Sequence, residues 1–498
     1  MPVDYDLVIV GNTPAAQVAA ATAVELSARV ALVLPYSATS CYAYLYPHAL
    51  QQASLKQSSH WDAHYPWQYA QATVGHFSHR VAPVLLAARG VDIIDGSGEF
   101  NQKKFQLAFH IGQRCLTAQK YLLAMGSQPQ VFNIPGLSQT GYLTLETLST
   151  VAKNEKIPRR WAIVGTEAIG VELAQTLCRL GCRVTLLVES EQVLPEEDPE
   201  AVAIIQAQLE AAGVILVTQV VVTKIGIKEG AKYLVVNDQN IYVDEIFLAS
   251  PARPLVENFG LGNVGVEYDD QGILVNRQLE TSNKRILACG SVCGKVLGGY
   301  YNEHLAEYEA KLAVRNALSS QPKSTKYSHI PWVVFSDPQL ARVGLTVASA
   351  QRRFQQRFVI LQANYLDNPK AMMAETNIGF IKMVVRCNGQ IVGATIVGPD
   401  AAESLQIIGL AIRQRLHIET LSRFPGVNLT HTHLVVAAAQ QWQRPLLWLQ
   451  AMEPIWQGLS VLRHKLVGLI AGGANIFTGF SQPRRQLKKK ARVVSGSK

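Results

Sequence analysis

Val8-Ile9-Val10-Gly11-Asn12-Thr13-Pro14-Ala15-Ala16 is a short apolar strand that runs into a turn and a helix, and Ala162-Ile163-Val164-Gly165-Thr166-Glu167-Ala168-Ile169-Gly170 repeats this arrangement. In the dinucleotide-binding pattern G-x-G-x-x-G/A, the first glycine makes the tight turn and the third small residue allows close packing of helix on strand. The middle glycine lets the backbone approach a pyrophosphate. Both copies hold another residue at the middle position, Thr13 in the first and Glu167 in the second. The sequence therefore indicates the fold more strongly than the ligand.

Each copy lies in the sequence context that the pattern requires. A short apolar run rich in β-branched residues precedes each motif, and a stretch with helical period follows it, as expected for buried parallel strands joined by a helix. Each helix leads into another apolar run, at 30–34 in the first unit and 184–188 in the second. Two complete strand–helix–strand units predict an α/β protein with two doubly wound, Rossmann-like nucleotide-binding domains.

The ribose-binding position is altered in both units. A carboxylate is expected at the end of the second strand, about 20 residues after the first glycine. Leu34 and Val188 stand there, and only Glu189, one residue later in the second unit, offers a carboxylate. No arginine lies beside Glu189, so a 2′-phosphate has no evident partner.

Composition indicates a globular protein of several domains. The chain has 498 residues, of which 48% are hydrophobic and 17% charged. It contains no apolar run near the ~18 residues of a membrane-spanning helix, and we expect no N-terminal targeting segment. Seven cysteines without zinc-finger spacing indicate reduced thiols in a cytoplasmic protein. The net charge of +9 is concentrated in 484–498, which holds seven basic residues and no acid, so we expect no nucleic-acid partner.

Residues 1–442 carry several segments that resemble those of one enzyme family, in the family's order. They resemble the pyridine nucleotide–disulfide oxidoreductases, the flavoprotein family of glutathione reductase, dihydrolipoamide dehydrogenase and mercuric reductase. The resembling segments are Ala124-Met125-Gly126-Ser127-Gln128-Pro129 (A-T-G-S-x-P), the acidic stretch 194–200, Ala288-Cys289-Gly290-Ser291-Val292 (A-x-G-D-V, along the flavin ribityl chain), 304–309, 331–339 (P-x-x-V-F-T-D-P-E) and 393–399.

The resemblance implies a domain organisation and a homodimer. It predicts an FAD-binding-type domain formed by 1–150 and 271–325, an NAD(P)-binding-type domain at 151–270, and an α+β dimerisation domain at 326–442. The remaining segment, 443–498, lies outside the resemblance.

The resemblance also implies FAD and NAD(P) as cofactors, with weakened sites for both. Leu34 and Ser291 replace two carboxylates expected on the flavin, a loss of about 3–6 kcal/mol in hydrogen bonds to charged groups. Glu167 places a carboxylate where a pyrophosphate is expected; the alternative is a helix-capping acid in a domain that binds nothing. Arg253 is displaced by one residue from the family position. The cofactor-binding candidates are Gly11, Thr13, Pro14, Ala15, Ala16, Ala124, Gly126, Gly290 and Ser291 for FAD, and Gly165, Gly170, Glu172 and Glu189 around the second motif.

The reaction centre of the family is incomplete in this chain, and we name no catalytic residue. Cys41 matches the first sulfur of the family's G-T-C-x-x-x-x-C, but Tyr46 or Leu45 stands at the second. Glu172 remains, but Leu50 or Ala49 replaces the lysine that pairs with it. His433 aligns with the acid–base histidine, but Ala438 replaces the glutamate that orients it. We therefore expect no disulfide reductase chemistry.

Three further clusters have a functional and a structural interpretation. Cys289 and Cys293 could form a replacement redox pair, but we favour inert buried thiols. We expect the same inert role for Cys178 and Cys182. His431 and His433 hold a metal or make polar contacts; no third ligand is visible, so we predict no metal site. Aromatic rings are concentrated in 36–80. They could stack on a quinone-like acceptor, but we favour the interpretation that they fill a vacated pocket.

The segment 443–498 contains an apolar stripe at helical period from Trp448 to Leu469, followed by a polybasic cluster at 484–492. An amphipathic helix with a basic cluster is typical of reversible attachment to an anionic membrane surface. The alternative is a helix packed on the protein's own dimer and a solvated tail.

Two functions follow from these observations. The first is a divergent FAD-dependent NAD(P)H oxidoreductase without disulfide chemistry, which passes electrons to a small quinone-like acceptor. The second is a non-catalytic binding or scaffold protein that keeps the fold.

Overall fold

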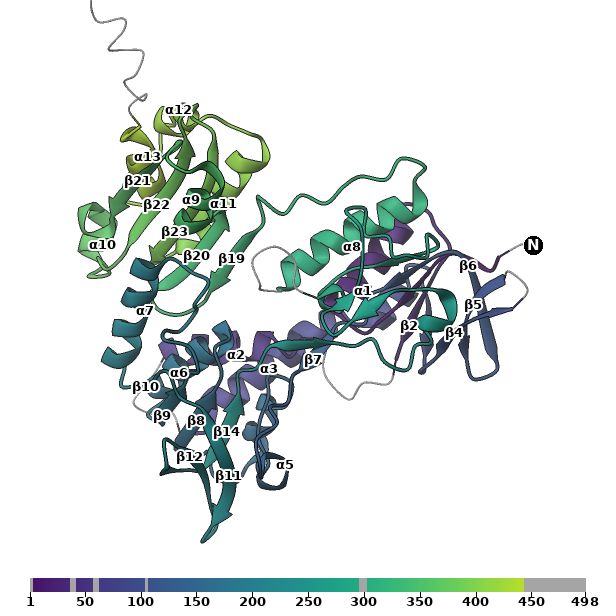
Figure 1. Cartoon of the computed structure of the whole chain (residues 1–498), viewed down its shortest axis with the longest axis horizontal. Helices are drawn as coiled ribbons and strands as arrows, with labels where there is room; N and C mark the ends of the chain where they lie inside the picture. Colours follow the sequence, from purple (N-terminus) through teal and green to yellow (C-terminus); the bar gives the residue numbers. More distant parts are fainter. Residues whose placement is uncertain (1–2, 36–41, 57–61, 104–105, 295–301, 443–498) are drawn as a thin grey trace, which may run out of the picture. The chain divides into compact units, whose positions relative to one another are not determined.

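The computed structural model describes residues 3–442 except 36–41, 57–61, 104–105 and 295–301 (Figure 1). Residues 1–442 form one compact unit. The predicted amphipathic helix and basic tail at 443–498 lie outside the described residues. Within the described ranges, no helix has both the length and the apolar character needed to cross a bilayer.

The first strand–turn–helix motif forms the centre of the first sheet. Its parallel strands follow the order β3 (Asp92–Asp95), β2 (Val30–Leu34), β1 (Tyr5–Val10), β6 (Arg114–Leu123), and β18 (Ile286–Ala288) pairs with β6. An antiparallel extension of β6 consists of β5 (Gln106–Ile111) and β4 (Glu99–Lys103). Leu7, Val8, Ile9 and Val10 are fully buried, as predicted for a central parallel strand.

Helices cover this sheet and extend beyond it. The motif helix α1 (Pro14–Glu25) packs against α8 (Glu303–Leu318), a pairing that Figure 1 shows although the two are far apart in sequence. Between β2 and β3 the chain inserts α2 (Leu45–Leu55), α3 (Tyr65–Arg80) and α4 (Pro83–Ala87).

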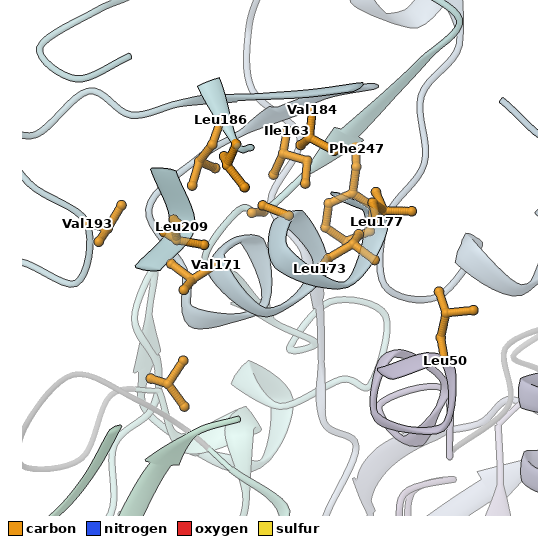
Figure 2. Packing of buried hydrophobic residues seen from close by; sticks show 14 of the residues in the cluster. Leu50, Ile163, Val171, Leu173, Leu177, Val184, Leu186, Val193, Leu209 and Phe247 are labelled. Atoms are coloured by element: carbon orange, nitrogen blue, oxygen red, sulfur yellow. The ribbon is translucent and has the colours of Figure 1, made fainter. Parts of the chain in front are cut away.

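The second motif forms a separate parallel sheet. Its order is β10 (Ile215–Val217), β9 (Arg183–Leu187), β8 (Arg160–Val164), β14 (Glu245–Leu248), with helices α6 (Ala168–Arg179) and α7 (Pro199–Ala211). An antiparallel meander follows, formed by β11 (Val222–Lys228), β12 (Ala231–Val236) and β13 (Gln239–Val243). Figure 2 shows the core of this region, in which Leu173 and Leu177 of α6 pack with Ile163, Leu186 and Phe247 of the strands.

Short elements join the two α/β regions. The outgoing connection contains β7 (Ser127–Pro129), α5 (Leu137–Thr140) and the 3-10 helix Leu148–Lys153, and the returning connection contains β15 (Ala252–Pro254). Because β7 and β15 pair in antiparallel fashion, the two connections lie side by side. The 3-10 helix Gly262–Val264, the hairpin β16 (Tyr268–Asp269) and β17 (Gly272–Ile273), and the 3-10 turn Ser291–Cys293 complete the return.

The C-terminal part of the described chain is an α+β unit, as predicted. Its antiparallel sheet follows the order β19 (Pro331–Val334), β20 (Gln339–Gly344), β23 (Ile391–Gly398), β22 (Phe380–Arg386), β21 (Phe358–Asn364). Among its helices, α11 (Ala401–Arg413) and α13 (His433–Gln440) pack on the sheet. The remaining helices are α9 (Val347–Phe354), α10 (Pro369–Met373), α12 (Ile418–Ser422) and the 3-10 turn Tyr365–Asp367. Two doubly wound sheets and this unit confirm the predicted fold class.

Candidate functional site

The turn of the first motif is built around Gly11 and Thr13. Gly11 has φ +150°, and a Cβ atom there would lie 2.0 Å from the carbonyl oxygen of Ala124, at the end of the adjacent strand β6. Thr13 is the N-cap of α1: its Oγ1 accepts a hydrogen bond from the Ala16 amide (3.1 Å) and donates one to the Ala124 carbonyl (2.8 Å). The threonine that replaces the middle glycine is thus a structural part of the turn.

A cavity of about 520 Å³, the first cavity, opens at the carboxyl ends of β1, β6 and β18. Parallel α/β sheets place ligand sites at this edge. Six predicted flavin-site residues line the first cavity, whereas Gly11, Ala16 and Ala124 pack behind it. Tyr44, one of the rings expected in 36–80, and Met125 of the segment 124–129 also line it. Asn302 and Glu303 line it too and were not predicted. The six predicted residues are Thr13, Pro14, Ala15, Gly126, Gly290 and Ser291.

The backbone of the first cavity fits a bound dinucleotide. Gly126 and Gly290 both have φ +82°, and a Cβ at Gly126 would lie 2.8 Å from the Thr13 methyl carbon. The N-terminus of α1 faces this cavity through Thr13, Pro14 and Ala15, and its dipole favours an anion there. Pro14 carries no amide hydrogen, and the Ala16 amide is bonded to Thr13. The residues present therefore fit FAD at this site, even with Thr13 in the turn.

The second motif repeats the same turn with a different middle residue. Gly165 has φ +131°, and a Cβ there would lie 2.0 Å from the Ala249 carbonyl oxygen. A Cβ on Gly170 would lie 2.8 Å from the Ala249 side chain, which is the close helix–strand approach that the motif predicts. Glu167 occupies the N-cap position of α6, but its side chain makes no capping hydrogen bond. The alternative of a helix-capping acid is therefore met in position, at the N-cap of α6, but without a side-chain capping bond.

Glu167 instead lines a second cavity, of about 930 Å³. Among the described residues, three carboxylates line it, those of Glu146, Glu167 and Asp270, against one cation, Arg253. Arg253 is already paired with Glu257 at 2.6 Å. The second cavity is therefore large enough for a nucleotide, but its charge opposes a pyrophosphate.

The other two predicted residues of the second motif lie elsewhere. Glu189 is exposed after the end of β9 and is outside the lining of both cavities. Glu172 is buried and is likewise outside both linings.

The first and second cavities share a wall. Ser291, which replaces the family's aspartate, lines both cavities, and so do four residues of the two connecting segments. Those four are Gln128, Pro129, Glu146 and Ala252. Ligands in the two cavities would thus approach each other at the paired strands β7 and β15.

Tyr46, one of the two candidates for the position of the missing second sulfur, is part of a buried aromatic core. Tyr46 is 2% exposed, and its hydroxyl donates to the Trp67 carbonyl at 3.1 Å. Trp67 stacks on Trp161 of β8, with ring centroids 5.9 Å apart and an interplanar angle of 9°. Of the described rings in 36–80, Tyr44 lines the first cavity, whereas Tyr46 and Trp67 fill core. Cys41 lies outside the described residues.

Glu172 is held by groups that sequence reasoning did not identify. The Phe335 amide donates to its Oε1 at 2.8 Å, and Nδ1 of His48 lies 3.8 Å from its Oε2. Burial raises the pKa of Glu172 to about 7 and lowers the pKa of His48 to about 4. Leu50, at the predicted lysine position, is fully buried in the same core cluster as Leu173 and Leu177 (Figure 2). His48 lies on α2 and Glu172 lies on α6, and the packing of these two helices brings the side chains together. No local sequence pattern encodes this contact.

The pKa values of the thiols beside the first cavity favour their structural interpretation. Cys289 and Cys293 have pKa values raised well above the ordinary thiol value by burial, with the charge of Glu309 as a secondary cause. Burial likewise raises the pKa of Cys182 to about 11 and raises that of Cys178. The structural interpretation of all four is favoured because the thiolate is the reactive form.

The two C-terminal histidines, His431 and His433, have different environments. His431 is 5% exposed, and its Nδ1 lies 2.8 Å from the Asp400 carboxylate. His433 begins α13 and is half-buried. Among the residues that the structure describes, no group of three potential ligands is placed to hold a metal ion. Polar contact is therefore the role that the geometry supports for His431.

Two family models match the chain. The pyridine nucleotide-disulphide oxidoreductase model matches residues 5–317, and the dimerisation-domain model of the same family matches 330–439. Members of this family use FAD and NAD(P), and the dimerisation domain supports a homodimer.

Curated relatives and solved structures agree with these matches. Mercuric reductase of Staphylococcus aureus is 31% identical over 345 residues, which is 68% of this chain and 61% of that protein. The chain thus spans about three fifths of the length of that reductase. Dihydrolipoyl dehydrogenase of Chlamydia pneumoniae is 26% identical over 468 residues, covering 86% of this chain and 95% of that protein. The HOCl-induced flavoprotein disulfide reductase RclA from Escherichia coli superposes with a TM-score of 0.78 at 23% identity, covering 88% of this chain and 100% of RclA; this likeness shows the fold alone.

Proposed function

The chain belongs to the pyridine nucleotide–disulphide oxidoreductases, and from this we propose that it is an FAD-dependent oxidoreductase that takes electrons from NAD(P)H. We propose further that a small quinone-like molecule accepts the electrons and that no protein disulfide takes part. FAD, when bound, supplies the hydride and electron transfer chemistry.

The shared wall of the first and second cavities carries this proposal. A flavin and a nicotinamide need only lie face to face for hydride transfer, and the two cavities adjoin at Ser291, Gln128 and Ala252. The α1 turn, Gly126 and Gly290 would hold FAD in the first cavity. Tyr44 and Met125 add an aromatic and an apolar surface to it. Such a surface suits a flat acceptor better than a charged one.

The proposed absence of disulfide chemistry rests on Tyr46 and Leu45, one of which stands where the second sulfur is expected. Tyr46 is buried and donates to the Trp67 carbonyl. An intramolecular disulfide with Cys41 has no second thiol at this position.

Glu172 and His48 provide one protonatable pair outside the linings of both cavities. Because Oε1 of Glu172 accepts from the Phe335 amide, a proton on this carboxyl group sits on Oε2, the oxygen nearer His48. With a pKa of about 7, Glu172 takes up or releases that proton near neutral pH.

The test is an absorption spectrum of the purified full-length protein. We expect flavin bands, their bleaching by NADH without oxygen, and their recovery on addition of 1,4-naphthoquinone. Cys41→Ser should turn over the quinone at the wild-type rate, because no thiol step is proposed. Reduction of oxidised glutathione or lipoamide, abolished in Cys41→Ser, would contradict the proposal.

A second candidate is a non-catalytic binding or scaffold protein. The three carboxylates of the second cavity favour it, because they weaken nicotinamide binding. A colourless purified protein that still dimerises would support this candidate over the first.

The segment 443–498 is proposed to attach the protein to an anionic membrane surface. Its stripe and basic cluster are the two signals that reversible attachment requires. Full-length protein should float with phosphatidylserine vesicles and a 1–442 variant should not; equal behaviour of both would exclude the idea.

A further inference from the structure

A third cavity, of about 550 Å³, lies outside both nucleotide sites. This volume is within the range of small-molecule sites, about 300–1,000 Å³. Its lining comes from the ends of β20 and β22, the start of β23, helix α9, the end of α11 and the segment 327–332. We call it the arginine cavity because Arg342, Arg353, Arg386 and Arg415 line it.

The arginine cavity carries an excess of positive charge. Glu196 is the one carboxylate among the described residues of its lining. Arg342 is neutralised by Glu197, whose buried Oε2 accepts from its Nε at 2.8 Å. Arg353, Arg386 and Arg415 form no ion pair with any residue in the described ranges. Three such arginines against Glu196 leave two uncompensated positive charges, which an anionic ligand would satisfy.

Two of these guanidinium groups are held in place by one ring. The Cζ atoms of Arg353 and Arg386 lie 5.5 Å and 5.2 Å from the centroid of Phe354. Arg386 also donates to the side chain of Gln390 at 3.0 Å. An arginine fork held in this way loses less entropy when it binds an anion, and its planar donors match phosphate oxygens.

The rest of the lining supplies hydroxyl groups and an apolar surface. Thr346 and Ser349 stand at the start of α9, with their hydroxyl oxygens 3.1 Å apart. Trp332 lies beneath the Arg342 guanidinium, with Cζ 5.6 Å from the ring centroid. Apolar side chains complete the wall, namely Leu305, Ile330, Ile391, Val392 and Ile412.

We propose that the arginine cavity binds a small phosphate monoester whose organic part is a flat ring. The phosphate dianion is bound by Arg353, Arg386 and Arg415, and the ring lies on the apolar wall beside Trp332 and Phe354. A carboxylate would satisfy only part of the charge. This site is separate from the chemistry proposed above and does not depend on it.

The arginine cavity is a neighbour of the first cavity. Asn302 lines both, and its side chain caps α8 by accepting a hydrogen bond from the Leu305 amide at 3.1 Å. The first turn of α8 therefore separates the two cavities.

The test is calorimetric titration of the full-length protein with phenyl phosphate, which lacks the sugar and base that the nucleotide sites recognise. We expect saturable binding of one phenyl phosphate per chain. Arg386→Gln and Arg353→Gln should each weaken it at least about tenfold, because each removes charge-assisted hydrogen bonds. Phenol, which has the ring without the anion, should show no saturable binding.

Arg357→Gln is the matched control, because Arg357 is an exposed arginine near α9 that does not line the cavity. It should bind phenyl phosphate as the wild type does. No saturable binding by the wild type, or equal affinities in Arg386→Gln, Arg353→Gln and wild type, would overturn the proposal. Because Arg353 is exposed, loss of binding in Arg353→Gln with unchanged melting temperature excludes misfolding as the cause.

Discussion

The two strand–turn–helix units share one turn geometry. In each, the first glycine has a positive φ and faces a carbonyl oxygen just past the adjacent strand, that of Ala124 in the first unit and Ala249 in the second. In each, the third small residue, Ala16 or Gly170, is buried. The conformational and packing roles of the motif therefore survive in both units.

The two units differ in the role of the residue at the middle motif position. Thr13 makes two hydrogen bonds within the turn and belongs to the fold. Glu167 makes no capping bond and lines the second cavity. Loss of the same glycine has thus produced a structural residue in one unit and a charge facing a cavity in the other. The motif pattern alone does not distinguish these outcomes.

The helices of the two units also differ at the same register. Seven positions after the first glycine, α1 carries Val18, which packs in an apolar core, and α6 carries Glu172, which holds the Phe335 amide. Two further groups on α6, the side chains of Gln175 and Arg179, hold Asp337. The second helix therefore joins two parts of the chain through polar contacts, whereas the first helix buries apolar surface.

The largest effect is expected at the feature that the units share. Gly165→Ala would place a Cβ 2.0 Å from the Ala249 carbonyl oxygen at φ +131°, so we expect a loss of about 3 kcal/mol or more in the free energy of unfolding. Gly11→Ala should cost a similar amount. Gly213→Ala is the control, because Gly213 has φ +94° but nothing within 4 Å, and should cost about 1 kcal/mol. Urea denaturation measures the loss in all three variants. If only one of Gly11→Ala and Gly165→Ala destabilised the protein, the two turns would not be equivalent.

The second effect concerns the helices and depends on pH. The pKa of Glu172 is raised from 4.5 to about 7, so the folded state binds more protons and the Glu172 contribution to stability falls as pH rises through this window. Glu172→Gln lacks this dependence and should gain about 3 kcal/mol relative to wild type between pH 4.5 and pH 8. The lowered pKa of His48 acts in the opposite direction, reducing stability as pH falls from about 6.5 to about 4. Urea denaturation across pH measures the difference; a constant difference would contradict the buried-acid assignment. Glu210→Gln, an exposed change on α7, controls for the loss of one carboxylate.

The third effect tests the middle residue of the second unit. Glu167→Gly should strengthen NADH binding about tenfold, because it removes a carboxylate at a helix N-terminus that faces the cavity. Glu167→Gln, which removes only the charge, should give most of this gain. Fluorescence titration with NADH measures both. Unchanged affinity in both variants would mean that other groups prevent nicotinamide binding.

The smallest effect tests the middle residue of the first unit. Thr13→Ala removes the N-cap of α1 and should cost about 1 kcal/mol of stability. Thr13→Ser keeps the hydroxyl and should cost less. Thermal unfolding measures both; a Thr13→Ala protein as stable as wild type would show that the cap contributes nothing.

The sequence predicted the fold because each element carries its own local pattern. The apolar run at Leu7–Val10 and the repeated turn encode a central parallel strand and its helix without information from distant residues. Six of the nine predicted flavin-site residues line one cavity for the same reason, since they lie at the carboxyl ends of neighbouring strands.

Contacts between distant segments were not predictable in this way. His48 and Glu172 are far apart in sequence, and so are Asp400 and His431, so neither pair leaves a local pattern. The first pair needs the inserted helix α2 in place, and the second needs the folded C-terminal unit. The arginine cavity likewise collects residues from six segments of the chain. The sequence also did not show that the Glu167 side chain makes no capping bond, because this depends on the geometry at the start of α6.

The parallel stack of Trp67 and Trp161 gives the molecule an optical signal of its own. Two indoles with centroids 5.9 Å apart couple their electronic transitions, and one belongs to the inserted helix α3 while the other belongs to β8. The circular dichroism of the strong indole transition in the far ultraviolet should therefore change when these two elements separate. The pair would report the docking of α3 on the second sheet without any attached dye.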